Sequence, residues 1–217
     1  MQLRIFGTHW PTRMENYELV LPDVEVYHGE ISKTELILIA YIVKRFEPEY
    51  MFEIGTFRGR TTSTMALNAN GRLKKVYTLD LDMVPDYLND ADKIYCHPDK
   101  VGTVFRNGME KKVSQRLEYI EQLWGDSREF DFSPYHKKMD LVFVDGGHDY
   151  QTECSDITNA LMMVKDDGIV LIHDFAMWRP EVINAVDTVA QAFDVYVFQD
   201  TTLAGIGKRL EGFYAEN

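Results

Sequence analysis

The sequence predicts an α/β fold whose sheet is doubly wound and mostly parallel, with an antiparallel last strand. Short apolar runs of strand type alternate with amphipathic helical patterns after the first thirty residues. Carboxylates or glycines follow several of these runs, at the points where parallel strands would end. Near the end of the chain, strand-like residues 195–199 and 203–208 are separated only by a short turn, which predicts an antiparallel pair.

Composition limits the class of protein. The 217 residues suffice for one domain with a sizeable core, and the formal net charge of −12 predicts an acidic surface that repels phosphate backbones. No apolar run reaches the length of a membrane span, and the start of the chain lacks the pattern of a signal peptide. We therefore expect a cytoplasmic protein that binds neither nucleic acid nor membrane.

Two segments stand apart from the alternating pattern. Residues 1–30 carry scattered aromatics and two prolines, and are expected to form an N-terminal arm on the domain or on a partner subunit. Such an arm would suit a homo-oligomer. The alternating pattern is expected to form a single domain of residues 31–217. Inside it, residues 81–116 are polar and irregular, which is typical of a lid or an acceptor-recognition insertion, or of a solvated one.

The regular elements can be placed along the chain. Ser32 and Glu35 form a capping-box pattern before a helix that Pro48 ends, and its apolar face is expected to hold Leu36, Ile39, Ala40 and Val43. Strands are then expected at residues 51–54, 75–80, 117–124, 140–145 and 169–172, and helices at 151–165 and 181–193.

The end of the first strand carries a glycine pattern. Glu53, Gly55 and Gly59 follow the spacing E-x-G-x-x-x-G, and glycine lets the backbone take positive φ and approach a ligand. Thr61 and Thr62 can cap the next helix, whose N-terminus favours a carboxylate or phosphate. A dinucleotide fingerprint would need a third glycine, which this chain lacks. A plain tight turn is the other interpretation.

Acidic residues follow the next two strands. Asp80 ends the second strand, 25 residues after Gly55, where a carboxylate commonly binds ribose hydroxyls. Asp82 is the alternative if that strand ends later. Asp126 and Ser127 follow the third strand and suit the edge of an adenine, because a carboxylate accepts from an amine and a hydroxyl can meet a ring nitrogen. Ser127 could instead cap a helix.

A second group of residues chemically equipped for acid–base work follows the fourth and fifth strands. Asp145 precedes two glycines and His148, and the fifth strand ends in His173 and Asp174. Histidine titrates near neutrality, so His148 fits a general base that takes a proton from a hydroxyl. Asp145, His173 and Asp174 could orient it or bind a cation. The alternatives are a solvated loop histidine at position 148 and a buried core histidine at position 173.

Five motifs together resemble class I S-adenosylmethionine (SAM)-dependent methyltransferases over about residues 30–210: FEIGTFRGRTT, VYTLDLD, GDSREFDF, LVFVDGGHDY and DGIVLIHDF. They are most similar to the family that groups with macrocin-type O-methyltransferases and cephalosporin-hydroxylase-like proteins. The resemblance implies a Rossmann-like, seven-stranded sheet with helices on both faces. It also implies methyl transfer from SAM to a hydroxyl of a sugar or secondary metabolite. The implied cofactor-binding residues are Glu53, Gly55, Thr56, Gly59, Thr61, Asp80, Asp126, Ser127 and Asp145.

The second group also resembles the site of catechol O-methyltransferase. Asp145 and Asp174 take the positions of two magnesium ligands there, and His148 takes that of a lysine general base. The third ligand of that enzyme is an asparagine, but Phe175 stands here and cannot ligate. His173 is expected to point to the opposite side of an extended chain. Since two carboxylates with waters can hold Mg²⁺, the implied metal ligands are Asp145 and Asp174, and the implied catalytic residues are His148, Asp145 and His173.

Two other functions remain open from the sequence. One is a nucleotide-cofactor oxidoreductase on a similar fold, against which the missing third glycine argues. The other is a non-catalytic protein that binds SAM, against which the group of acids and histidines argues.

Overall fold

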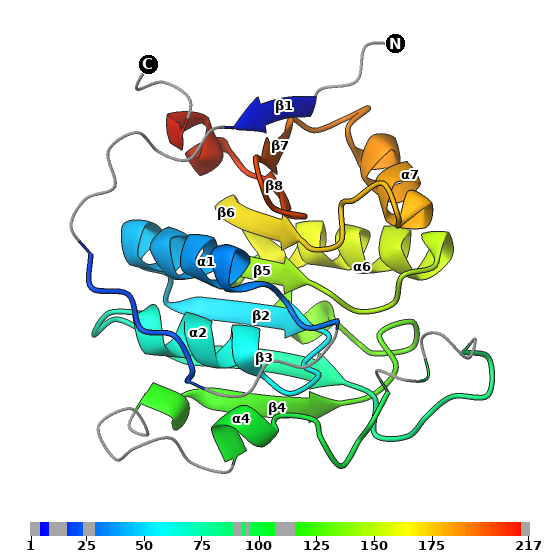
Figure 1. The fold of residues 1–217 in the computed structure, drawn as a ribbon, viewed down its shortest axis with the longest axis horizontal. Coiled ribbons are helices and arrows are strands. Elements are labelled where there is room, and N and C mark those ends of the chain that lie inside the picture. The colour runs from blue at the N-terminus through cyan, green and yellow to red at the C-terminus, as the bar shows by residue number, and fades with distance from the viewer. Residues whose placement is uncertain are drawn as a thin grey trace. The chain divides into compact units, whose positions relative to one another are not determined.

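The computed structural model describes residues 5–8, 17–23, 29–88, 93, 96–106 and 116–213. The chain divides into two compact units. The first unit is residues 17–130, and the second unit is residues 131–217 together with residues 1–16. Figure 1 draws the strands and helices of both units, which alternate along the chain as the sequence predicts.

The first unit is built on three parallel strands. β3 (Lys75–Asp80) lies between β2 (Tyr50–Ile54) and β4 (Ile120–Trp124), so the carboxyl ends of all three meet at one edge. Parallel strands need long crossover connections. Helix α2 (Arg60–Asn68) crosses from β2 to β3, and the connection from β3 to β4 includes the short helix α4 (Thr103–Arg106).

Helix α1 (Lys33–Phe46) leads into the first strand of this unit. Its predicted capping box is confirmed, since the Ser32 hydroxyl accepts from the Glu35 N–H at 3.2 Å and the Glu35 carboxylate accepts from the Ser32 N–H at 2.9 Å. Its four predicted core residues are buried. Glu47 closes the helix in a left-handed conformation with φ of 50°, directly before Pro48.

The second unit is built on five strands, with β8 (Ala204–Ile206) as the antiparallel one. β8 pairs with both β7 (Val195–Phe198) and β6 (Val164–Ile172), and β6 pairs in parallel with β5 (Met139–Val144). Helix α6 (Tyr150–Met163) connects β5 to β6, and α7 (Pro180–Val189) connects β6 to β7 (Figure 1). The described residues of this unit also include two short 3₁₀ helices, η1 (Ser133–Tyr135) and η2 (Lys208–Phe213).

Several boundaries differ from the prediction. β6 begins at Val164 rather than near residue 169, because its pairing with β5 shifts between Met139 and Leu141 and residues 165–168 form an irregularity within the strand. Helix α7 ends four residues early. Residues 5–8, expected as part of an arm, form strand β1 (Ile5–Thr8) in parallel with β7. Four residues are too few to reveal a strand by their alternation.

The interior strands are buried along most of their length, as continuous apolar runs in parallel sheets usually are. In the first unit the fully buried side chains include Met51, Phe52 and Leu79, and in the second they include Val142 and Phe143. Within the described ranges, every helix falls short of the length and apolar character that crossing a membrane would require.

Candidate functional site

In the first unit, Asp80 holds the glycine turn that follows β2. Its Oδ2 accepts from the Phe57 N–H at 2.6 Å and its Oδ1 accepts from the Leu81 N–H at 2.7 Å. The Gly55 N–H donates to the Leu79 carbonyl at 2.9 Å, which ties the start of the turn to β3. The Asp80 carboxylate therefore ties the turn after β2 to the end of β3.

The second glycine of the pattern is required by packing. Gly59 has φ of 83°, and a Cβ at this position would lie 2.4 Å from the ring of Phe105 on α4. Two backbone hydrogen bonds join the same segments, from Gly102 N–H to the Phe57 carbonyl (2.7 Å) and from Val104 N–H to the Arg58 carbonyl (2.9 Å). Part of the predicted insertion at residues 81–116 thus lies directly against the glycine turn.

Substituting Gly59 with alanine is expected to destabilise the protein by about 2 kcal/mol or more, through left-handed strain and overlap with Phe105. Urea unfolding would measure it. The double variant G59A/F105A should not recover the wild-type stability, because the backbone strain remains and a cavity is added. Gly71, where a Cβ would meet nothing within 4 Å, is the matched control. Equal stability of G59A and G71A would contradict the packing role of Gly59.

The start of α2 corrects one prediction. Thr61 and Thr62 were expected to cap this helix, but it begins at Arg60 with Gly59 as the N-cap residue and no side-chain cap. Both threonines lie in the first helical turn and are buried. The Thr62 hydroxyl donates to the Glu53 carboxylate instead. The Glu53 carboxylate is buried and needs hydrogen-bond donors, and this explains the different role.

Glu53 is 1% exposed and ends a chain of hydrogen bonds across the three strands of the first unit. Its Oε2 accepts from the Thr78 hydroxyl at 2.5 Å. Since that proton is used, Thr56 must donate in its 2.6 Å contact with Thr78, and Gln122 Nε2 donates to Thr56 at 3.0 Å. The structure therefore brings two predicted cofactor residues, Glu53 and Thr56, into one buried network beside the glycine turn.

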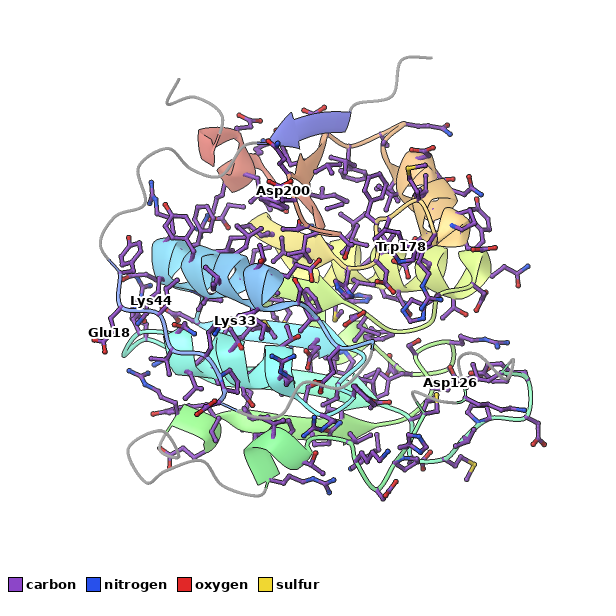
Figure 2. The ribbon with its side chains drawn as sticks, viewed as in Figure 1. Glu18, Lys33, Lys44, Asp126, Trp178 and Asp200 are labelled. Atoms are coloured by element: carbon purple, nitrogen blue, oxygen red, sulfur yellow. The ribbon has the colours of Figure 1, made fainter. Side chains whose placement is uncertain are left out.

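The turn after β4 contains the predicted adenine-edge residues (Asp126 is labelled in Figure 2). The Gly125 N–H donates to the Asp80 carbonyl at 2.9 Å, so the ends of β3 and β4 are joined. No helix begins at Ser127, because the N–H groups of Glu129 and Phe130 close a turn on the Asp126 carbonyl. The interpretation of Ser127 as a helix cap was therefore wrong.

Sequence reasoning missed Tyr87, which donates its hydroxyl to Asp126 Oδ2 at 2.5 Å. Partial burial and the hydrogen bond to Asp126 raise the pKa of this phenol to about 12, so it stays a protonated donor. Asp126 Oδ1 also accepts from the Arg128 N–H at 2.9 Å. The only signal in the sequence is an aromatic residue in the polar segment after Asp80, which is weak by itself.

In the second unit, the structure brings together the acids and histidines that follow β5 and β6. Asp145, His148 and Asp174 each place a ligand-type atom within 4.8 Å of the others. His148 Nε2 lies 3.0 Å from Asp174 Oδ2, and His173 Nδ1 lies 2.8 Å from Asp145 Oδ1. All four residues predicted for this group are thus in contact with another member. We call these four residues the acid–histidine cluster.

The expected direction of His173 was wrong. Asp174 has φ of 57°, so the chain turns sharply after β6, and His173 Nδ1 lies 3.6 Å from Asp174 Oδ1. Left-handed backbone costs a non-glycine residue about 1–2 kcal/mol and is often found at functional sites. Burial disfavours the charged form of Asp174, but the hydrogen bond from His148 and the charges of His173 and Arg179 outweigh it and lower the pKa.

Helix α6 fixes the loop that carries His148. Asp149 caps this helix and accepts from the N–H groups of Gln151 and Thr152, both at 3.1 Å. A Cβ on Gly147 would lie 2.6 Å from the Thr152 methyl group, so the loop can pack against the helix only with glycine there. The sequence showed two glycines before His148, but the packing role of Gly147 depends on Thr152.

Glu153 on α6 is a further acid that sequence reasoning missed. It is 2% exposed, and its Oε1 has no hydrogen-bond partner among the described residues. Burial is the main cause that raises its pKa well above the usual range, and the negative charges of Asp156, Asp145 and Asp174 add to this against the opposing effect of His148. The raised pKa favours the neutral form of Glu153, which lies within electrostatic range of the cluster.

Comparisons with known proteins give the fold and the family of this chain. The family model described as a methyltransferase domain matches residues 52–175, more than half of the chain and a range that includes both the glycine turn and the acid–histidine cluster. No curated protein sequence shows a significant match.

Solved structures share the fold at low sequence identity. An O-methyltransferase from Bacillus cereus in complex with SAH (S-adenosylhomocysteine) has a TM-score of 0.60 at 13% identity, and the match covers 84% of each chain. The O-methyltransferase TomG from Streptomyces achromogenes is involved in tomaymycin synthesis, and its structure is in complex with SAM. It has a TM-score of 0.59 at 13% identity, and the match covers 82% of this chain and 81% of that one. The methyltransferase PaMTH1 from Podospora anserina, bound to SAH, has a TM-score of 0.60 at 12% identity. The match covers 82% of this chain and 79% of that one.

These similarities confirm the predicted Rossmann-like α/β fold with its mostly parallel sheet and antiparallel last strand. The family match also favours the methyltransferase reading over the oxidoreductase alternative. The chain belongs to the methyltransferase-domain family, and its resemblance to class I SAM-dependent methyltransferases is confirmed.

Proposed function

We propose that this protein methylates a hydroxyl group of a small molecule by in-line transfer from SAM. The acid–histidine cluster is the observation that carries the proposal, because a hydroxyl must lose its proton to attack a methyl carbon. The similar structures from Bacillus cereus and Streptomyces achromogenes are named O-methyltransferases, which favours oxygen over nitrogen as the acceptor atom.

The first unit is proposed to bind the cofactor. Asp80 accepts from the ribose hydroxyls while it holds the glycine turn, and Asp126 accepts from the adenine amine. Glu53 supplies negative charge for the amino end of the methionine part. The SAM and SAH bound to the similar structures support this assignment. The remaining proposed cofactor residues are Gly55, Thr56, Gly59, Thr61, Ser127 and, in the second unit, Asp145.

When bound, the cofactor supplies a methyl group already activated by the sulfonium, so the protein must position the acceptor and remove its proton. We assign the removal of the acceptor's proton to His148. Its Nε2 faces Asp174 Oδ2 at 3.0 Å, and this carboxylate stabilises the imidazolium that forms. The oxygen–carbon bond forms as the carbon–sulfur bond breaks, with its electron pair going to sulfur. His173, 7% exposed, keeps Asp145 in place through the 2.8 Å contact.

A divalent cation fits the same cluster. Asp145 and Asp174 offer carboxylate oxygens and His148 offers a nitrogen, which is a donor set that Mg²⁺ or Mn²⁺ accepts. The two aspartates would hold the cation, and Phe175 adds no ligand. A cation would lower the pKa of a bound hydroxyl, and this would reduce the demand on His148 as a base.

A methyl-transfer assay tests the proposal. Methyl-labelled SAM would be incubated with the protein and a panel of phenols, sugars, amines and thiols, with Mg²⁺ or with EDTA. We expect label in hydroxyl acceptors. Transfer to amines alone would overturn O-methylation, and the absence of transfer from a protein that still binds SAH would favour the non-catalytic alternative. Activity lost in EDTA and restored by Mg²⁺ would support the cation.

A further inference from the structure

Tyr87 has a place in the first unit that the proposed function does not yet use. It follows β3 by seven residues and is 50% exposed, yet its hydroxyl is fixed to Asp126 Oδ2 at 2.5 Å. The Arg128 guanidinium carbon lies 4.2 Å from the centre of the Tyr87 ring. The hydroxyl of this ring is hydrogen-bonded and one face is covered by Arg128, but half of the side chain is exposed. The exposed surface is available to a planar ligand.

The three side chains support one another. Asp126 Oδ1 accepts from the Arg128 N–H at 2.9 Å, while its Oδ2 accepts from the phenol. Arg128 stacks on Tyr87 as a cation on an aromatic face, which is a favourable contact. The ring is therefore held in one orientation before any ligand binds, so little entropy is lost on stacking.

We propose that Tyr87 is the stacking platform for the adenine ring of the cofactor, with Asp126 and Arg128 as its supports. This inference rests on the proposed cofactor site. The phenol hydroxyl and the adenine amine both project from the edge of a planar six-membered ring. If adenine lies over the exposed face of Tyr87, its amine is directed toward the same carboxylate. Among the described residues, two donors bind the Asp126 carboxylate, which has about four lone pairs in all.

The neighbouring strand ends place this platform beside the proposed ribose site. The Gly125 N–H donates to the Asp80 carbonyl at 2.9 Å, so the residue before Asp126 is joined to the residue proposed to bind ribose. A nucleoside whose ribose hydroxyls bind Asp80 would place its base near Asp126 and Tyr87. Aromatic stacking tolerates any base, whereas the carboxylate of Asp126 favours one with an amine at this edge.

Four variants test the platform by calorimetric titration with SAH. We expect Tyr87→Ala to weaken SAH binding about 10- to 100-fold, the range of base–aromatic stacking. Tyr87→Phe keeps the ring and loses the hydrogen bond to Asp126, so a smaller loss of about 2- to 10-fold is expected. Tyr87→Trp should retain binding. Tyr135→Ala, in η1 of the second unit, is the control and should bind SAH as the wild type does.

A fluorescence measurement separates stacking from a merely structural tether. In Tyr87→Trp, SAH should quench additional tryptophan emission beyond any change in the wild type, because a stacked adenine quenches an indole. Equal affinity of Tyr87→Ala and the wild type, or no added quenching in Tyr87→Trp, would overturn the platform. A wild-type protein that fails to bind SAH would instead contradict the proposed function itself.

Discussion

Replacing His148 with alanine is expected to lower methyl transfer about 100- to 10,000-fold, the usual contribution of a general base. Its Nε2 lies 3.0 Å from Asp174 Oδ2, and Asp174 has a lowered pKa, so a charged carboxylate stands ready to stabilise the imidazolium at neutral pH. Affinity for SAH should stay close to that of the wild type, because His148 belongs to the proton-transfer step. Initial rates with the identified acceptor, together with SAH titration, measure both effects.

His136 is the matched control for this variant. It is a half-buried histidine in the second unit that follows η1, and it belongs to no part of the proposed site. The His136→Ala protein should keep its turnover. If turnover survives in His148→Ala, His148 is not the base. If Asp174→Asn lowers turnover in the presence of Mg²⁺ while His148→Ala does not, activation of the hydroxyl belongs to a cation held by the aspartates.

Replacing Asp80 with alanine is expected to weaken SAH binding about 10- to 100-fold, since hydrogen bonds to a charged group contribute about 1.5–3 kcal/mol each. The substitution removes the proposed acceptor of the ribose hydroxyls. It also frees the N–H groups of Phe57 and Leu81, so the glycine turn loses its anchor. Titration calorimetry gives the affinity, and thermal unfolding shows whether the fold is kept.

Two further variants make this test specific. Asp80→Asn keeps an acceptor oxygen at the same place and should lose less affinity than Asp80→Ala. Asp82 is exposed and lies two residues further on, at the alternative position for the ribose contact. Asp82→Ala should bind SAH normally. A loss in Asp82→Ala with none in Asp80→Ala would reverse the assignment.

The sequence predicted the placement of strand ends well, because residues adjacent in the sequence determine where a strand ends. A short apolar run followed by an acid or a glycine marks where a parallel strand stops, and this places Asp80, Asp126 and Asp145 correctly at strand ends. Parallel pairing then brings such ends to one edge within each unit. The capping box at Ser32 is local in the same way and was confirmed.

The remaining features depend on residues far apart in sequence or on single dihedral angles. Gly59 is required by Phe105, which lies 46 residues later, so its motif alone suggested ligand approach and not packing. The direction of the His173 side chain relative to Asp174 depends on the left-handed φ of Asp174, which no sequence pattern predicts. Tyr87 and Glu153 gain their roles from neighbours that only the fold provides.

The glycine turn and the strand ends of the first unit are proposed to bind SAM. Calorimetric titration of the whole chain with SAH, with and without Mg²⁺, tests it most directly. We predict saturable binding at one site, strongly reduced in Asp80→Ala, and a change in affinity or heat with Mg²⁺ if Asp145 and Asp174 hold a cation. A folded protein that binds no SAH in either condition would contradict the claim.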